Sequence, residues 1–288
     1  MKQVQLLGLT SFRFLFIFNI CYSFNVMKNK DIKILFVDID WTILDHKNKR
    51  LDIKSIKGLK KAQKRGIKVF LCTARPYHSV EQTGLFKIFQ PDGAVYASGA
   101  MVSVEGKTIY KNIIPHNILY PIAESTIKHG LTMECTLENG RFLIAPKDDY
   151  VDACFSIFFE EMPEVGDYHD QEVVSILLFC PKDKEKQLKK EMPDGVKWFR
   201  FHDSGVDVCY KTHQKSDGVV MALNHISLLK EQSMSFGDDF SDISMFNATG
   251  IGVALNNGKE EAKKAANYVT KEVWKHGVYH ALKTYKII

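Results

Sequence analysis

The feature that most constrains this chain is an apolar run that stops at two carboxylates. Residues 32–37 are apolar apart from Lys33, and Asp38 and Asp40 follow directly. Such a run is typical of a strand covered on both faces in a parallel sheet, and open α/β sheets bind ligands beyond the carboxyl ends of their strands. Alternation directs the two acids to the same side. Because neighbouring carboxylates repel, we expect a divalent cation, a shared proton or water beside them.

Length and composition indicate a globular chain. Its 288 residues, 45% of them hydrophobic, suit one domain with a large insertion or two modest domains. The net charge of +5 is spread without a long basic run, so we expect no nucleic-acid partner, while a small anionic substrate is compatible with it. The six cysteines show no zinc-type spacing, and we interpret them as reduced residues of a cytoplasmic protein: Cys21, Cys72, Cys135, Cys154, Cys180 and Cys209.

The first 26 residues contain a short apolar stretch that Arg13 interrupts. No small-residue cleavage site follows, and the stretch is short for a membrane span. Met27 and the three residues after it resemble a natural start. We therefore expect residues 1–26 to lie outside the fold, with a targeting or interfacial segment as the alternative, and we expect no stable membrane association.

The next segment alternates strands and helices. Asp52 is a candidate cap for a helix that ends at Arg65-Gly66, and a second strand over residues 67–72 leads to Thr73. Strand, helix and strand in this order predict a right-handed βαβ unit, which places Thr73 at the same sheet edge as Asp38. Residues 91–97 predict a third strand, and residues 101–110 a hairpin.

From about Ile114 the pattern changes to that of an α+β insertion. Helical stretches (117–129, 148–161, 182–190) alternate with strand-like ones (131–136, 141–145, 173–179, 196–201), and Asn139-Gly140 is a hairpin signal. This predicts an antiparallel sheet with helices on one side. We expect the chain to return to the first domain around Gly205 to Cys209.

Two more groups of charged residues follow. A short strand, residues 234–237, precedes Asp238, Asp239 and Asp242, and Lys215 begins a helical segment. Taken singly, an Asp-rich turn often only caps a helix, and a lone lysine is usually solvated. A cluster of acids around a phosphate does, however, need compensating positive charge, which an ammonium group supplies.

Together these motifs resemble those of the haloacid dehalogenase (HAD) superfamily of aspartate-nucleophile phosphatases. The residues 38–42, Thr73, Lys215 and 237–242 match its four motifs in order, and the segment 250–270 is similar to that of the Cof-type members. The resemblance covers residues 28–288. It implies a Rossmannoid three-layer α/β/α core, residues 27–113 and 202–288, with an inserted α+β cap of the C2 type over residues 114–201.

The resemblance also implies roles for individual residues. Asp38 is expected as the nucleophile that forms an aspartyl-phosphate, and Asp40 as the general acid and base. Mg²⁺ is the expected cofactor, with a site formed by Asp38, Asp40 through its carbonyl, Asp238 and Asp242. Expected to bind the substrate and its phosphate are Thr42, Thr73, Ala74, Lys215 and Ser241.

The sequence departs from the family pattern at three positions. Trp41 and Ala74 stand where glycine is usual, and Ser241 where asparagine is usual. We expect a Mg²⁺-dependent phosphatase of a small phosphorylated metabolite, such as a sugar phosphate, acting as a monomer or small homo-oligomer. The alternatives are a phosphotransferase or phosphomutase, which share these residues, and a catalytically weak protein that binds a phosphoryl ligand.

Overall fold

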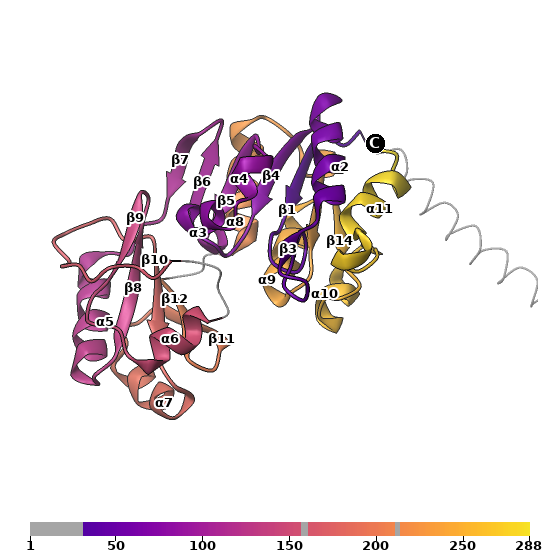
Figure 1. Cartoon of the computed structure of the whole chain (residues 1–288). Helices are drawn as coiled ribbons and strands as arrows, with labels where there is room; N and C mark the ends of the chain where they lie inside the picture. Colours follow the sequence, from indigo (N-terminus) through magenta and orange to yellow (C-terminus); the bar gives the residue numbers. More distant parts are fainter. Residues whose placement is uncertain (1–30, 157–160, 211–213) are drawn as a thin grey trace, which may run out of the picture.

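The chain forms a larger α/β domain and a smaller α+β domain inserted into it, which lie side by side in Figure 1. We describe a computed structural model over residues 31–156, 161–210 and 214–288. The prediction for residues 1–26 lies outside these residues. Within the described ranges, no helix combines the length and the apolar character needed to cross a membrane.

The larger domain is built on an eight-stranded sheet of order β15-β14-β13-β1-β4-β5-β6-β7. The strands from β15 to β5 run parallel, and β6 and β7 are antiparallel additions at one edge. Their bounds are β1 Ile34–Val37, β4 Lys68–Cys72, β5 Gly93–Tyr96, β6 Met101–Val104, β7 Lys107–Lys111, β13 Ser233–Gly237, β14 Ile251–Ala254 and β15 Tyr268–Val269.

Helices cover both faces of this sheet. One face packs against α2 (Ile53–Lys64), α3 (Tyr77–Gln82), α4 (Leu85–Ile88) and α11 (Gly277–Thr284). The other packs against α8 (Lys215–His225), α9 (Phe240–Ala248) and α10 (Glu260–Ala265). The predicted three-layer α/β/α arrangement is therefore confirmed.

Strand β1 is central because it joins two apolar cores. Leu35 and Val37 point into one core, and Ile34 and Phe36 into the other, and all four are fully buried. Burying a side chain of this size stabilises the fold by roughly 1.5–3 kcal/mol. The apolar run seen in the sequence is thus explained by burial on both faces.

The unit β1-α2-β4 has the predicted βαβ form, with β1 and β4 parallel neighbours. Asp52 caps α2 by accepting hydrogen bonds from the backbone N–H groups of Lys54 and Ser55. The short antiparallel pair β2 (Leu44–Asp45) and β3 (Arg50–Leu51) lies between β1 and α2.

The inserted domain is an antiparallel five-stranded sheet of order β11-β12-β10-β8-β9. One face packs against α5 and α7 around a third apolar core. The prediction that the helices pack on one side is wrong for α6, which forms a smaller core with Leu177 and Phe179 on the opposite face. The elements are α5 His116–Lys128, β8 Thr132–Leu137, β9 Gly140–Leu143, α6 Asp149–Phe155, β10 Ser175–Phe179, α7 Lys182–Glu191, β11 Val196–His202 and β12 Gly205–Tyr210.

Two predicted boundaries are wrong. The segment 205–209 does not return to the larger domain, because β12 pairs with β10 on one side and β11 on the other. The cap therefore extends to Tyr210, beyond the predicted end at residue 201. Helix α6 ends at Phe155, whereas residues 148–161 were expected to be helical, and residues 157–160 lie outside the described ranges.

The close packing of α8 on the sheet leads to a test. A Cβ atom at Gly218 would lie 2.3 Å from Cγ1 of Val95. Although alanine is the better helix former, Gly218→Ala should destabilise the protein by about 1–3 kcal/mol through overpacking. Urea unfolding measures this, with Asn224→Ala on the exposed side of the same helix as the control. A Gly218→Ala protein as stable as the control would contradict the packing.

Candidate active site

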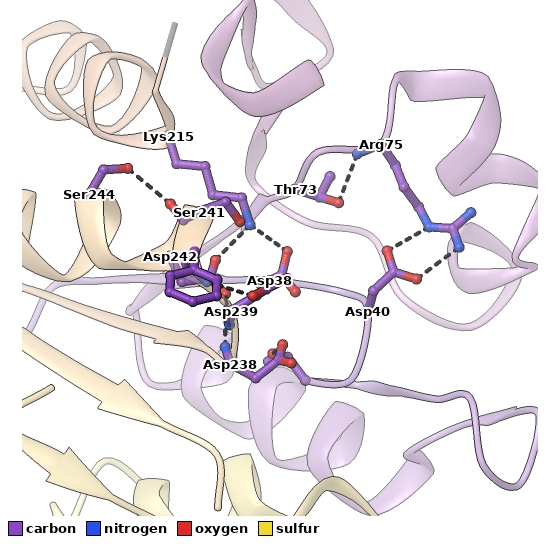
Figure 2. Close-up of polar contacts among 12 residues, drawn as sticks. Asp38, Asp40, Thr73, Arg75, Lys215, Asp238, Asp239, Ser241, Asp242 and Ser244 are labelled. Carbon is purple, nitrogen blue, oxygen red and sulfur yellow. Dashed lines mark hydrogen bonds and ion pairs between the residues drawn. The ribbon is translucent and has the colours of Figure 1, made fainter. Parts of the chain in front are cut away.

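The predicted motifs meet at the carboxyl edge of the larger sheet. Strand β1 lies between β13 and β4, so Asp38, Asp238 and Thr73 follow three adjacent strands. The backbone N–H of Asp38 donates to the carbonyl of Phe236 at 2.9 Å and ties the first and last motifs together. Figure 2 shows the acids converging at this edge.

Lys215 lies between two of the acids. Its Nζ donates to Oδ1 of Asp38 at 2.7 Å and to Oδ1 of Asp242 at 2.6 Å, and its side chain is 2% exposed (Figure 2). Burial by itself would lower the pKa of Lys215, but the carboxylates of Asp242 and Asp38 raise it well above its ordinary value. The group is therefore an ammonium ion at neutral pH.

Asp242 organises the loop after β13. Its Oδ2 accepts hydrogen bonds from the backbone N–H groups of Asp238 at 2.8 Å and Asp239 at 2.9 Å. Only a residue without a side chain fits before these amides, since a Cβ at Gly237 would lie 2.3 Å from Cγ of Asp242. With Lys215 on its other oxygen, Asp242 has both carboxylate oxygens engaged.

The acids form a group suited to a cation. Asp38, Asp238 and Asp242 are buried, and each offers a carboxylate oxygen within 4.8 Å of the others. Burial, together with the negative charge of Asp242, raises the pKa of Asp38 and of Asp238, although Lys215 opposes the shift. Negative charge is therefore incompletely compensated here, and carboxylate oxygens are ligands that Mg²⁺ prefers.

Asp40 points away from this group toward Arg75 (Figure 2). The Arg75 guanidinium donates to both carboxylate oxygens at 2.8 Å, and Nε2 of His46 lies 2.6 Å from Oδ1. Burial alone would raise the pKa of Asp40, but Arg75 and His46 hold it well below its ordinary value. Asp40 is thus ionised in this arrangement.

The other predicted residues divide into two groups. Ala74 and Ser241 are exposed and line the cleft above the acids. Thr42 and Thr73 are fully buried: the Thr42 hydroxyl donates to Oδ1 of Asp238 at 3.1 Å, and the Thr73 hydroxyl accepts from the backbone N–H of Arg75. Phosphate binding by these residues stays a prediction.

Trp41 takes the backbone conformation that explains why glycine is usual there. Its φ is 56°, in the left-handed region that costs a bulky residue roughly 1 kcal/mol or more. The Trp41 ring lies against His46, with 5.2 Å between centroids, and its carbonyl accepts from Nδ2 of Asn257. These contacts hold the strained turn in place.

The cleft above the acids is shared by the two domains. It measures about 320 Å³, and its lining includes Asp38, Lys215 and Asp238 from the larger domain. The smaller domain contributes Glu134, Thr136, Arg141, Phe155, Ser175, Leu177, Phe201 and Asp207. The smaller domain therefore forms one wall of the site.

The sequence did not identify the residues of the cap that line the cleft. It also did not identify Arg75 and His46 of the larger domain as site residues. Arg75 directly follows Thr73-Ala74 at the strand end, and only 7% of it is exposed, which is uncommon for arginine. The cap wall had a weaker signal: in β8, Glu134 and Thr136 alternate with Met133 and Cys135, which indicates one polar face.

Comparison with known proteins decides the family. Residues 35–282 match the family of haloacid dehalogenase-like hydrolases. The chain belongs to this family. The catalytic motifs of this hydrolase and its whole inserted domain fall within the match.

Three similar proteins agree with this assignment. YkrA of Bacillus subtilis, provisionally named a phosphatase, is 28% identical over 273 residues, which cover 88% of this chain and 97% of YkrA. A hypothetical protein from Geobacillus kaustophilus has a structure with a TM-score of 0.83 and 27% identity, covering 89% of this hydrolase and 100% of that chain. The HAD subclass IIB sugar phosphatase BT4131 gives a TM-score of 0.76 and 29% identity, again covering 89% and 100%.

The comparisons confirm the predicted superfamily, its Cof-type subfamily and the class of phosphoric monoester hydrolase. The predicted HAD-like α/β fold is confirmed as well.

The cap wall of this hydrolase predicts an unusual pH effect. Burial, together with the negative charge of Glu134, raises the pKa of Asp207 from 3.8 to about 7. The folded state then binds more protons than the unfolded state between these values, so this carboxyl lowers stability progressively as the pH rises from about 4 to about 7 and by a constant amount above that. Asp207→Asn should stabilise the protein more at pH 8 than at pH 5, by roughly 1–2 kcal/mol after solvent screening.

Urea unfolding of both proteins at the two pH values measures this difference. Asp203→Asn is the matched control, because Asp203 lies at the surface of the same domain, paired with Lys182. The Lys182 ammonium lowers the pKa of Asp203, so the control should show a small effect or one of opposite sign. A pH-independent gain in Asp207→Asn would contradict the raised pKa.

Proposed function

We propose that this hydrolase is a Mg²⁺-dependent phosphatase that hydrolyses a small phosphorylated metabolite through an aspartyl-phosphate on Asp38. One observation carries the proposal: a carboxylate at a strand end, with a buried ammonium 2.7 Å away, faces a cleft that a second domain closes on one side. A nucleophile, a neutralising cation and a restricted volume are the requirements of this reaction.

The donor set fits magnesium. Asp38 and Asp238 are the residues that would hold the ion, because Asp242 is already engaged by Lys215 and two backbone amides. Asp242 would then act by fixing the loop that carries Asp238, and the carbonyl of Asp40 would complete the protein's share of the ligands. When bound, the cation screens the negative charges of nucleophile and phosphate from each other.

The reaction proceeds in two displacements. A carboxylate oxygen of Asp38 attacks phosphorus, the new P–O bond forms, and the bond to the leaving alcohol breaks while Asp40 gives that oxygen a proton. Asp40 then takes a proton from water, whose oxygen attacks the phosphorus and frees phosphate and Asp38. Lys215 keeps Asp38 ionised and oriented and stabilises the phosphoryl oxygens.

Asp40 must change partners to act as an acid. Arg75 and His46 hold it as a carboxylate in the described arrangement, and an ionised group has no proton to give. Asp40 would therefore exchange at least part of its contact with Arg75 for the leaving-group oxygen. Arg75 would become the positioning residue of the general acid.

The surroundings support a small substrate. A cleft of about 320 Å³ holds a metabolite rather than a polymer. Five of the six cysteines lie in the described residues and are free thiols, which fits the reducing environment of the cytoplasm. Release of inorganic phosphate, rather than transfer to a second substrate, separates hydrolysis from the mutase alternative.

The two leading acids should behave differently. Asp38→Asn removes the nucleophile, so turnover should vanish and no phosphorylated protein should form. Asp40→Asn keeps the nucleophile and removes the proton transfer, at a cost of about a hundredfold to ten-thousandfold in rate. The loss should be smaller for an aryl phosphate than for a sugar phosphate, because an acidic phenol needs little protonation.

Rapid quench of Asp40→Asn with an aryl phosphate, followed by intact-mass measurement, tests this prediction. A phosphorylated chain should accumulate in Asp40→Asn and be absent in Asp38→Asn. Equal losses for both leaving groups, or phosphorylation of Asp38→Asn, would overturn the assigned roles. Turnover that persists without magnesium would overturn the metal requirement.

A further inference from the structure

One face of the cap sheet carries a row of side chains that the catalytic steps leave unused. The register pairs Leu177 of β10 with Glu134 of β8 on one side and with Asp207 of β12 on the other. Directly opposed residues share a face, so these three side chains lie in one row. All three line the cleft, so the row faces the phosphoryl site rather than the core that the sheet shares with α5 and α7.

The opposite face of the sheet explains why this row is not needed for the main apolar core of the cap. Met133, Cys135, Ile176 and Val208 alternate with the row and are buried in the core shared with α5 and α7. The other face is apolar only in part, where Leu177 and Phe179 pack against α6. The rest of that face can carry polar groups, and it carries two carboxylates.

The charge of the cleft is strongly unbalanced. Among the described residues, seven carboxyls line it, against three basic side chains. All three bases are engaged: Lys215 with Asp38 and Asp242, Arg75 with Asp40, and Arg141 with Glu134. A magnesium ion and a phosphate monoester dianion carry opposite double charges, so loading both leaves the excess of negative charge in place.

The two cap acids lack strong partners. Glu134 is 3% exposed, and its contacts are long: Nη1 of Arg141 donates to one carboxylate oxygen at 3.4 Å, the Thr136 hydroxyl donates to the other at 3.4 Å, and Nε2 of His78 lies 3.7 Å away. Both ring nitrogens of His78 are buried without a hydrogen-bond partner within the described ranges. Among the same residues, the Asp207 side chain makes no hydrogen bond or ion pair, and burial, together with the charge of Glu134, raises its pKa.

We propose that the cap row Glu134–Leu177–Asp207 selects phosphate esters whose leaving group carries a protonated amine. The inference rests on the proposed phosphatase function and names its substrate class. The phosphoryl group would lie at Asp38 and Lys215, and the ammonium group at Asp207, with Glu134 behind it.

An ammonium group fits this wall better than a hydroxyl or an anion. It supplies up to three hydrogen-bond donors and a positive charge to Asp207, for which the described residues offer neither, and adds a donor to Glu134, whose contacts with Arg141 and Thr136 are both 3.4 Å long. Phe201, which is 43% exposed and lines the cleft, offers an aromatic surface that also attracts cations. A second anionic group on the leaving alcohol would meet the two carboxylates and be repelled.

Matched substrate pairs test the proposal. Glucosamine 6-phosphate and glucose 6-phosphate differ by one amine in place of a hydroxyl, and so do phosphoethanolamine and 2-hydroxyethyl phosphate, which place the amine nearer the phosphate. The wild-type enzyme should favour the amine in at least one pair by about tenfold to a hundredfold in kcat/KM, as expected for a hydrogen bond to a charged group. 6-Phosphogluconate should be a poorer substrate than glucose 6-phosphate.

Asp207→Asn should reduce that preference to about threefold or less, because the amide keeps the shape and loses the charge. Asp203→Asn, on the surface of the same domain, should retain the wild-type ratio. Hydrolysis of p-nitrophenyl phosphate by the wild-type enzyme is measured in parallel. Its absence would defeat the phosphatase function itself.

Each remaining outcome decides the specificity proposal alone. Hydrolysis of p-nitrophenyl phosphate without an amine preference in either pair would overturn it. Equal losses of kcat/KM on amine and hydroxyl substrates in Asp207→Asn would also overturn it. The carboxyl would then bind hydroxyl groups or stabilise the cap instead of selecting an amine. An unchanged amine preference in Asp207→Asn would exclude Asp207 as the selecting group.

Discussion

The site depends on one buried ion cluster, the Lys215 ammonium between Asp38 and Asp242. These groups are almost completely buried, and a buried charge without a partner is costly. Loss of one partner from such a cluster typically lowers stability by about 3–5 kcal/mol. The cluster also joins three distant parts of the chain: the end of β1, the start of α8 and the first turn of α9. Fold and reactive geometry are therefore maintained by the same contacts.

The domain arrangement separates chemistry from recognition. Every side chain assigned to bond making and proton transfer belongs to the larger domain, and the smaller domain supplies only the facing wall of the cleft. The cap sheet is stabilised by its other face, where its apolar residues meet α5 and α7. Glu134 and Asp207 belong neither to this core nor to the smaller one at α6, so these positions can change without removing apolar contacts.

Much of the fold could be predicted because its signals are local. The apolar run of β1, the Asp52 cap and the Asn139-Gly140 hairpin each follow from a few adjacent residues, and each is found where expected. The end of the cap could not be predicted this way. Residues 205–210 have the composition of a strand, but only their pairing with β10 and β11 shows to which sheet they belong.

The candidate site divides in the same manner. The order and spacing of Asp38, Asp40, Lys215 and Asp238 pointed to phosphoryl chemistry through their resemblance to the HAD motifs, because each residue taken singly has common structural uses. The sequence could not reveal that Arg75 holds Asp40, or that no basic side chain in the described ranges pairs with Asp207. Those facts depend on distances between segments far apart in the chain and on the exclusion of water, and only tertiary packing determines both.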